Sequence, residues 1–296
     1  MAGRRAITLT EMLVTVGSLA CLLVALVPAL TSTKDTAERT ACAANLSQIG
    51  TALLVYAADH DGRLPDCGAA SPLGGPVPAD GRHVSSRFDA PGTCNWPNVR
   101  AVGNQANLWL LVREGYTVPG IFVCPATADR PSLNGARASA VMGFVATDPA
   151  TGKPVPDEAR FFRRVAAGRC SYSYQNQFAH PATDPDVARP GAPATHRAVH
   201  PPDLAVCADR NPYTRQPLTR QPTVSPDSNP EANSLNHHGT GQNVLYLSGE
   251  VRWSDTPRCG ARRHDGRRDH IYRPDAGDPT DPLNLPRSPA DSFLVP

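Results

Sequence analysis

The chain begins with a long apolar run that carries almost no charge. Residues 12–30 contain no charged side chain, and extending the run back to position 7 adds only Glu11. As a helix, residues 7–30 would be about 36 Å long at about 1.5 Å per residue, enough to cross a bilayer core of about 30 Å. The pattern predicts one membrane-spanning helix, with Arg4 and Arg5 on the cytoplasmic side.

Beyond position 30 the apolar pattern narrows to a single stripe. Its members recur at steps of four and three, the spacing of one helix face: Cys42, Leu46, Ile49, Leu53 and Tyr56. Gly62 is a suitable C-cap, and Pro65 prevents the helix from continuing. We therefore expect one helix from about residue 7 to residue 59, in which the amphipathic part, within 31–62, packs on a folded head.

The head, residues 63–296, is rich in residues that interrupt regular structure. The chain has 31 prolines and 23 glycines, so long loops should alternate with short elements. The pattern predicts a helix at 107–114, a buried segment at 121–125, and strands at 171–174, 204–208, 244–247 and 250–253. The expected fold class is α+β, a long N-terminal helix followed by a small antiparallel sheet with long loops.

The stretch 236–253 gives the clearest local prediction within the head. A glycine-rich turn precedes an apolar strand, a two-residue turn of Ser248 and Gly249, and a strand that alternates Val251 and Trp253 inward. Gly249 can supply the positive φ that a tight hairpin needs. The sequence therefore predicts a β-hairpin here.

Glu11 is the one charged residue of the apolar run. A carboxylate inside a membrane is costly unless it finds a partner, which makes it a candidate functional residue. The surrounding sequence, Arg-Ala-Ile-Thr-Leu-Thr-Glu-Met-Leu at 5–13, resembles the leader of type IV prepilins and pseudopilins. Ala6 stands where this family usually has a glycine before the cleavage site, and Ile7 where the mature chain usually begins with phenylalanine.

This resemblance implies processing and assembly steps. Prepilin peptidase would remove residues 1–6, the new N-terminus at Ile7 would be methylated, and Glu11 would pair with the N-terminal amine of a neighbouring subunit. Pro28 lies where many pilins have a kinking proline, consistent with its missing N–H. Two alternatives are a secretory signal peptide cut after residues 27–29 and a plain membrane anchor. Signal-peptide cores rarely carry a charge or run into an amphipathic stripe, so the sequence favours the prepilin interpretation.

A second resemblance involves several segments of the head. Residues 236–253 are similar to the C-terminal motif of a planctomycete-type prepilin-like family, related to type II secretion system protein G, whose head has no known function. In that motif nine residues separate a histidine from Asp-Gly, and here His238 has that spacing to Ser248 and Gly249. The family also has segments like residues 42–50, 61–65, 122–125 and 171–174.

The eight cysteines include no Cys-x-x-Cys pair, which gives zinc-ribbon and thioredoxin-like interpretations little support. In an exported head disulfides are chemically permitted. The candidates are Cys67, Cys94, Cys124, Cys170, Cys207 and Cys259. A Cys67–Cys94 bridge would close an irregular loop, but the connectivity cannot be read from the sequence alone.

Charge and motifs disfavour several other functions. The net charge of +2 gives no indication of nucleic-acid binding. The sequence shows no nucleophile elbow and no paired acids in a context that suggests glycosidase chemistry, so it does not indicate a hydrolase. His237 and His238 would point to opposite faces of an extended segment, so no metal site is predicted. The segment 59–62, Asp-His-Asp-Gly, resembles only the start of a calcium loop. We predict no cofactor, with calcium as a minor alternative.

These patterns favour a non-enzymatic, prepilin-like structural subunit of a type II secretion or type IV pilus-like assembly. It would be a single-pass inner-membrane protein with a cytoplasmic N-terminus and an extracytoplasmic head. Its expected partners are prepilin peptidase, other pilin-like subunits and the secretion machinery, and no nucleic acid. The alternatives are a membrane-anchored module that binds a glycan or a protein and, less favoured, an exported hydrolase that uses the histidines.

Overall fold

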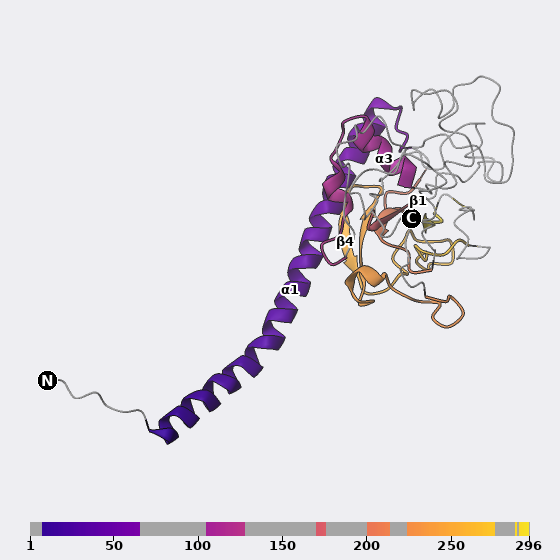
Figure 1. Ribbon diagram of the computed structural model, residues 1–296. Helices are drawn as coiled ribbons and strands as arrows, with labels where there is room; N and C mark the ends of the chain where they lie inside the picture. Colours follow the sequence, from indigo (N-terminus) through magenta and orange to yellow (C-terminus); the bar gives the residue numbers. More distant parts are fainter. Residues whose placement is uncertain are drawn as a thin grey trace, which may run out of the picture.

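The computed structural model describes residues 8–65, 105–127, 170–175, 200–213, 224–275, 288 and 290–295. A long helix carries a small sheet near its C-terminal end and extends far beyond it on the N-terminal side (Figure 1). The predicted processing residues Ala6 and Ile7, and the disulfide candidates Cys67 and Cys94, lie outside the described residues.

The helix α1 spans Leu9–Asp59 without interruption, 51 residues in all. Its end is the predicted one, because Gly62 adopts a φ of +81° and donates its N–H to the carbonyl of Ala57 at 2.7 Å. Pro28 lies inside the helix, and α1 is bent between its free part and the part on the sheet (Figure 1). The predicted long N-terminal helix is confirmed over the described residues.

Within the described residues, five antiparallel strands form one sheet in the order β4-β3-β2-β1-β5. Their bounds are β1 Tyr172–Gln175, β2 Ala205–Asp209, β3 Gln242–Tyr246, β4 Val251–Ser254 and β5 Leu294–Val295. The helix α3 spans Gln105–Arg113, and short 3-10 helices form η2, Pro119–Phe122, and η5, Leu235–His237. The α+β class is confirmed. The sequence did not predict β5, because two residues are too few to show a pattern.

Both faces of the sheet are covered. On one face the apolar stripe of α1 packs with α3 and η2 into a core that includes Tyr172 and Leu245. A second core on the other face contains Val244, Tyr246 and Tyr272. Burial on both sides explains why β1, β2 and β3 are buried at every position instead of alternating.

The predicted hairpin joins β3 and β4, but its turn differs from the expectation. Tyr246 donates its N–H to the carbonyl of Glu250 at 2.9 Å, and Gly249 donates to the carbonyl of Tyr246 at 2.8 Å. Three residues, 247–249, therefore form the loop, not Ser248 and Gly249 alone. Gly249 has a φ of +91°, as predicted, and a positive φ at this third position is typical of three-residue hairpin loops.

Candidate functional site

Four ionisable side chains from distant parts of the chain meet between α1 and the sheet. They are Cys42 on α1, Cys124 just after η2, Asp209 at the end of β2 and His237 at the end of η5. One ligand atom from each lies within 4.8 Å of the other three. All four are buried, and His237, the most accessible, is only 3% exposed. We call these four residues the donor cluster.

The local structure explains how each side chain reaches this point. Cys42 is the first member of the apolar stripe that faces the sheet. The 3-10 turn that ends at Phe122 buries that side chain, and Cys124 follows two residues later. His237 ends η5 because the next residue, His238, adopts a left-handed φ of +58°. This reversal leaves His237 buried and His238 exposed.

The contacts within the donor cluster are short. The thiol of Cys42 donates to Asp209 Oδ1 at 3.0 Å. Cys124 Sγ lies 3.5 Å from His237 Nε2, and the same nitrogen lies 3.4 Å from Asp209 Oδ2. The hydroxyl of Tyr172 is 3.4 Å from Cys42 Sγ. Two partners therefore approach a single nitrogen of His237.

Neighbouring groups fix the orientation of the acid. The backbone N–H of Asn243 donates to Asp209 Oδ2 at 2.7 Å, and the side-chain amide of Asn236 donates to Oδ1 at 3.0 Å. Asn236 belongs to η5, so the same short helix supplies both a member of the donor cluster and a support for another. Two N–H groups of asparagine residues thus orient the carboxylate, and neither carries a charge.

An aromatic layer covers the histidine. The ring of Trp253, on β4, packs edge-on against His237 with a centroid separation of 5.4 Å. The guanidinium of Arg39, on α1, lies 4.3 Å from the centre of the Trp253 ring. Trp253 therefore points inward, as predicted, and its ring contacts a member of the donor cluster.

Burial and mutual contact set the protonation of these groups. Burial raises the pKa of the Asp209 carboxyl and of the Cys42 thiol. For Cys124, the hydrogen bond with Cys42 outweighs burial and lowers the thiol pKa to about 7. Burial opposes the charged form of His237, but the hydrogen bond with Cys124 and the charge of Asp209 outweigh it and raise the pKa. Cys124 is therefore a readily deprotonated thiol beside a basic imidazole.

The geometry does not suit nucleophilic catalysis. In a catalytic triad the nucleophile and the acid contact different nitrogens of the histidine, whereas here Cys124 and Asp209 both approach Nε2. Since Cys42 and Cys124 are also fully buried, a substrate has no approach to either sulfur. The four donors lie within 4.8 Å of one another and do not have the linear order of a proton relay.

The structure places the other predicted residues away from this cluster. Glu11 is exposed on α1 and caps its N-terminus: Glu11 Oε2 accepts hydrogen bonds from the N–H and the hydroxyl of Thr8, each at 2.8 Å. Ser248 is exposed, and its N–H donates to the carbonyl of Pro202 at 2.9 Å, which ties the hairpin loop to the segment before β2. The predicted motif histidine, His238, is not a member of the donor cluster. The residue before it, His237, is.

The structure shows no bridge between the described disulfide candidates. Cys124, Cys207 and Cys259 are present as thiols, and the disulfides of the head stay a prediction. Cys124 faces His237, while the thiol of Cys170 donates to the carbonyl of Tyr172 at 3.4 Å. Pairs that involve Cys67 or Cys94 lie outside the described residues.

The segment proposed as a minor calcium alternative forms the end of α1. Asp59 Oδ2 accepts a hydrogen bond from the hydroxyl of Tyr116 at 2.9 Å. Asp61 adopts a φ of +54° and begins the reversal that Gly62 completes. These observations assign both acids to the junction between α1 and the residues after α3.

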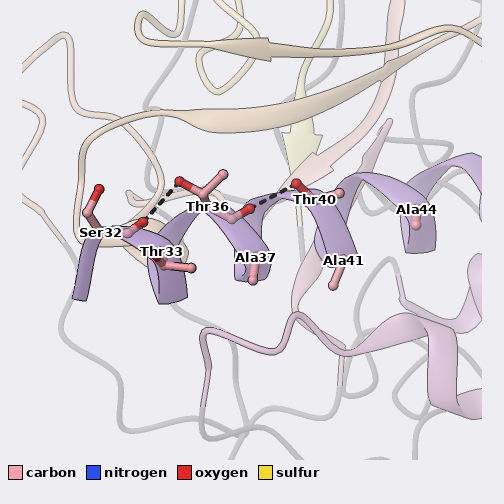
Figure 2. Close-up of a pocket in the computed structure, with 7 residues that line it drawn as sticks. All are labelled: Ser32, Thr33, Thr36, Ala37, Thr40, Ala41 and Ala44. Carbon is pink, nitrogen blue, oxygen red and sulfur yellow. Dashed lines mark hydrogen bonds between the residues drawn. The ribbon is translucent and has the colours of Figure 1, made fainter. Parts of the chain in front are cut away.

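A shallow groove runs along α1 between the free part of the helix and the head. It is lined by small side chains on one side of the helix: Ser32, Thr33, Thr36, Ala37, Thr40, Ala41 and Ala44 (Figure 2). The hydroxyls of Thr36 and Thr40 donate to carbonyls one turn earlier, at 3.0 and 2.9 Å (Figure 2). Their hydroxyls are thus satisfied within the helix, and the side chains that line the groove are all small.

No protein family model, curated protein sequence or solved structure matches the chain. The fold and the contacts above are therefore the basis for assigning its function.

Proposed function

We propose that this protein is a prepilin-like structural subunit, cut between Ala6 and Ile7, anchored in a membrane by residues 7–30 and assembled through the free part of α1. The observation that carries the proposal is the exposure of large apolar side chains on that part of the helix. Leu9 is 83% exposed and Val24 is 75% exposed. Between them the exposed set comprises Met12, Leu13, Val14, Val16, Leu19, Leu22 and Leu23.

These side chains surround the helix and do not form a stripe. Successive residues are rotated by about 100°, so three neighbours such as Leu22, Leu23 and Val24 point in widely different directions. A helix that is apolar on every face requires a lipid or protein environment. The part of α1 that contacts the head cannot supply that environment, because it lies farther along the same helix.

Hydropathy alone does not separate the two halves of α1. The stretch Leu30–Asp59 is also long and apolar enough to cross a membrane. However, 44% of the most apolar 18 residues in this stretch are buried in the head, so the apolar stripe already has a partner. The exposed stretch Leu9–Val24, together with the residues that follow it, is the better anchor.

Glu11 supports assembly beyond simple anchoring. A charged group in the first turns of a membrane anchor is costly to insert, and an uncharged glutamine could complete the same capping box without that cost. In this structure Thr8 satisfies one carboxylate oxygen, and in an assembly the amine of a neighbouring Ile7 would supply the countercharge. The groove lined by the small side chains of Figure 2 is compatible with a closely packed neighbouring helix, since small side chains allow helix backbones to approach.

The test must separate the capping role of Glu11 from its assembly role. Glu11→Gln keeps a capping-box residue at this position but removes the charge, whereas Glu11→Ala removes both. Thr8→Ala is the matched control, because it removes the hydroxyl contact and keeps the carboxylate. Lys34 lies just beyond the membrane-spanning residues and its side chain is 74% exposed, so an amine-reactive crosslinker can join neighbouring subunits in native membranes at this residue.

At equal membrane abundance, wild type and Thr8→Ala should form crosslinked oligomers, and both Glu11 variants should lose them. Adding Lys34→Arg to the wild type should abolish the same products, which shows that they arise at this site. Equal crosslinking of Glu11→Gln and wild type would contradict the assembly role. It would leave an anchored binding module as the better account.

A further inference from the structure

The donor cluster combines four groups of a kind that bind transition metals. Thiolate and imidazole are ligands for zinc and for divalent iron and cobalt, while oxygen-rich sites suit calcium and magnesium. The donors of Cys42, Cys124, Asp209 and His237 all lie within 4.8 Å of one another. We propose that these four residues bind one divalent transition-metal ion, zinc by preference, and that the ion fastens α1 to the sheet.

Two of the separations match those of a tetrahedral site. With metal–sulfur bonds of about 2.3 Å and metal–nitrogen or metal–oxygen bonds of about 2.0 Å, sulfur and nitrogen ligands lie about 3.5 Å apart, and nitrogen and oxygen about 3.3 Å apart. Cys124 Sγ and His237 Nε2 are 3.5 Å apart, and His237 Nε2 and Asp209 Oδ2 are 3.4 Å apart. The shorter 3.0 Å contact of Cys42 with Asp209 is a thiol hydrogen bond, whose proton is released when a metal binds.

The charge of the site suits a divalent cation. When a metal binds, the two thiols and the carboxyl lose their protons and carry three negative charges in a site where every member is buried. Such charge would be strongly destabilising without compensation. A divalent cation neutralises two of the three charges, and the hydroxyl of Tyr172 beside Cys42 Sγ can stabilise a thiolate. The amide donors of Asn243 and Asn236 to Asp209 orient the carboxylate, as outer groups commonly do in metal sites.

The architecture indicates a structural ion and not a catalytic one. Four protein ligands complete a tetrahedron, which leaves no position for water or substrate. The ligands come from α1, the segment after η2, β2 and η5, so one ion would join the helix to three separate parts of the head. Binding that occurs only in the folded state adds to stability. This role is independent of membrane assembly and can fail or succeed separately from it.

The first experiment uses the full chain in detergent micelles. The reduced protein is loaded with Zn²⁺, dialysed, and analysed for bound metal by mass spectrometry, and a second sample is loaded with Co²⁺. We expect one ion per chain. The cobalt sample should show thiolate-to-metal charge transfer and the intense visible bands of tetrahedral coordination. Because this readout requires no substitution, it does not depend on the folding of a variant.

Substitutions then locate the ion. Cys124→Ser and His237→Gln should lose stoichiometric metal and the cobalt spectrum. The matched controls, Cys259→Ser at another buried thiol and His238→Gln at the adjacent exposed histidine, should keep both. A strong chelator should lower the melting temperature of wild type and leave that of His237→Gln unchanged.

Three results would overturn the proposal. One is reduced wild type that binds no stoichiometric Zn²⁺ or Co²⁺. Another is metal binding that persists in both Cys124→Ser and His237→Gln. The third is a Cys42–Cys124 disulfide in protein isolated without reductant, together with no metal binding after reduction, which would identify the pair as a redox site.

Discussion

Both ring nitrogens of His270 are hydrogen bonded in a way that only the neutral ring allows. Nε2 donates to the carbonyl of Pro230 at 3.2 Å, and Nδ1 accepts the N–H of Tyr272 at 3.2 Å. A proton on Nδ1 would face another donor. The side chain is 5% exposed, and burial lowers its pKa from 6.5 to about 4.

This shift makes the stability of the head depend on pH. The pKa of His270 is lower in the folded state, so between about pH 6.5 and pH 4 the unfolded chain binds the proton more readily. Stability must therefore fall as the pH falls through this window. At about 1.4 kcal/mol per pKa unit, a shift of about 2.5 units corresponds to about 3 kcal/mol.

The assay is urea unfolding of the full chain in micelles at a series of pH values, followed by tryptophan fluorescence. His270→Asn should be less stable than wild type at pH 7.5, because it loses the bond to Pro230. The difference between the two proteins should shrink by about 3 kcal/mol by pH 4. Burial also raises the pKa of Asp209 and Asp269, but both proteins share those contributions, so they cancel in the comparison.

His238→Asn is the matched control, because it replaces an exposed histidine. It tests whether loss of any histidine makes the free energy of unfolding less dependent on pH. A difference between wild type and His270→Asn that stays constant from pH 7.5 to pH 4 would refute this reasoning. It would mean that His270 is protonated equally in the folded and unfolded chains.

Two further substitutions test the packing of α1 and the attachment of β5. Leu53→Ala removes a side chain that is 2% exposed and should cost about 2–5 kcal/mol in urea unfolding. Val55→Ala, at a position that is 49% exposed, should cost well under half as much. Asn211→Ala removes the amide that donates to the carbonyls of Tyr272 and Leu294 at 3.0 and 2.7 Å, and each buried carbonyl left unpaired should cost about 1–3 kcal/mol. A loss below about 1 kcal/mol for either buried site would contradict the packing described here.

Local patterns in the sequence predict much of this fold. The stripe from Cys42 to Tyr56 gives the buried face of α1, and Gly62 gives its end, because helix periodicity and capping depend on neighbouring residues. The positive φ of Gly249 is predictable for the same reason. The loop length of the hairpin is not, since the register of β3 against β4 is set by packing on both faces of the sheet.

The donor cluster could not be predicted in this way. Its members are separated by dozens of residues, so no ligand spacing is visible, and Asp209 stands at the end of an otherwise apolar strand. A signal was nevertheless present in the sequence, because Cys42, Cys124 and His237 each lie in a segment that we interpreted as similar to the prepilin-like family. Only the fold shows that these segments meet.

The central claim, that the chain is processed like a prepilin, is tested most directly at its N-terminus. The measurement is mass spectrometry of the N-terminal peptide of full-length protein extracted from membranes that contain prepilin peptidase. The account predicts a mature chain that begins at Ile7 and carries one methyl group on its amine. A chain that begins at Leu30, or one that retains residues 1–6, would contradict it.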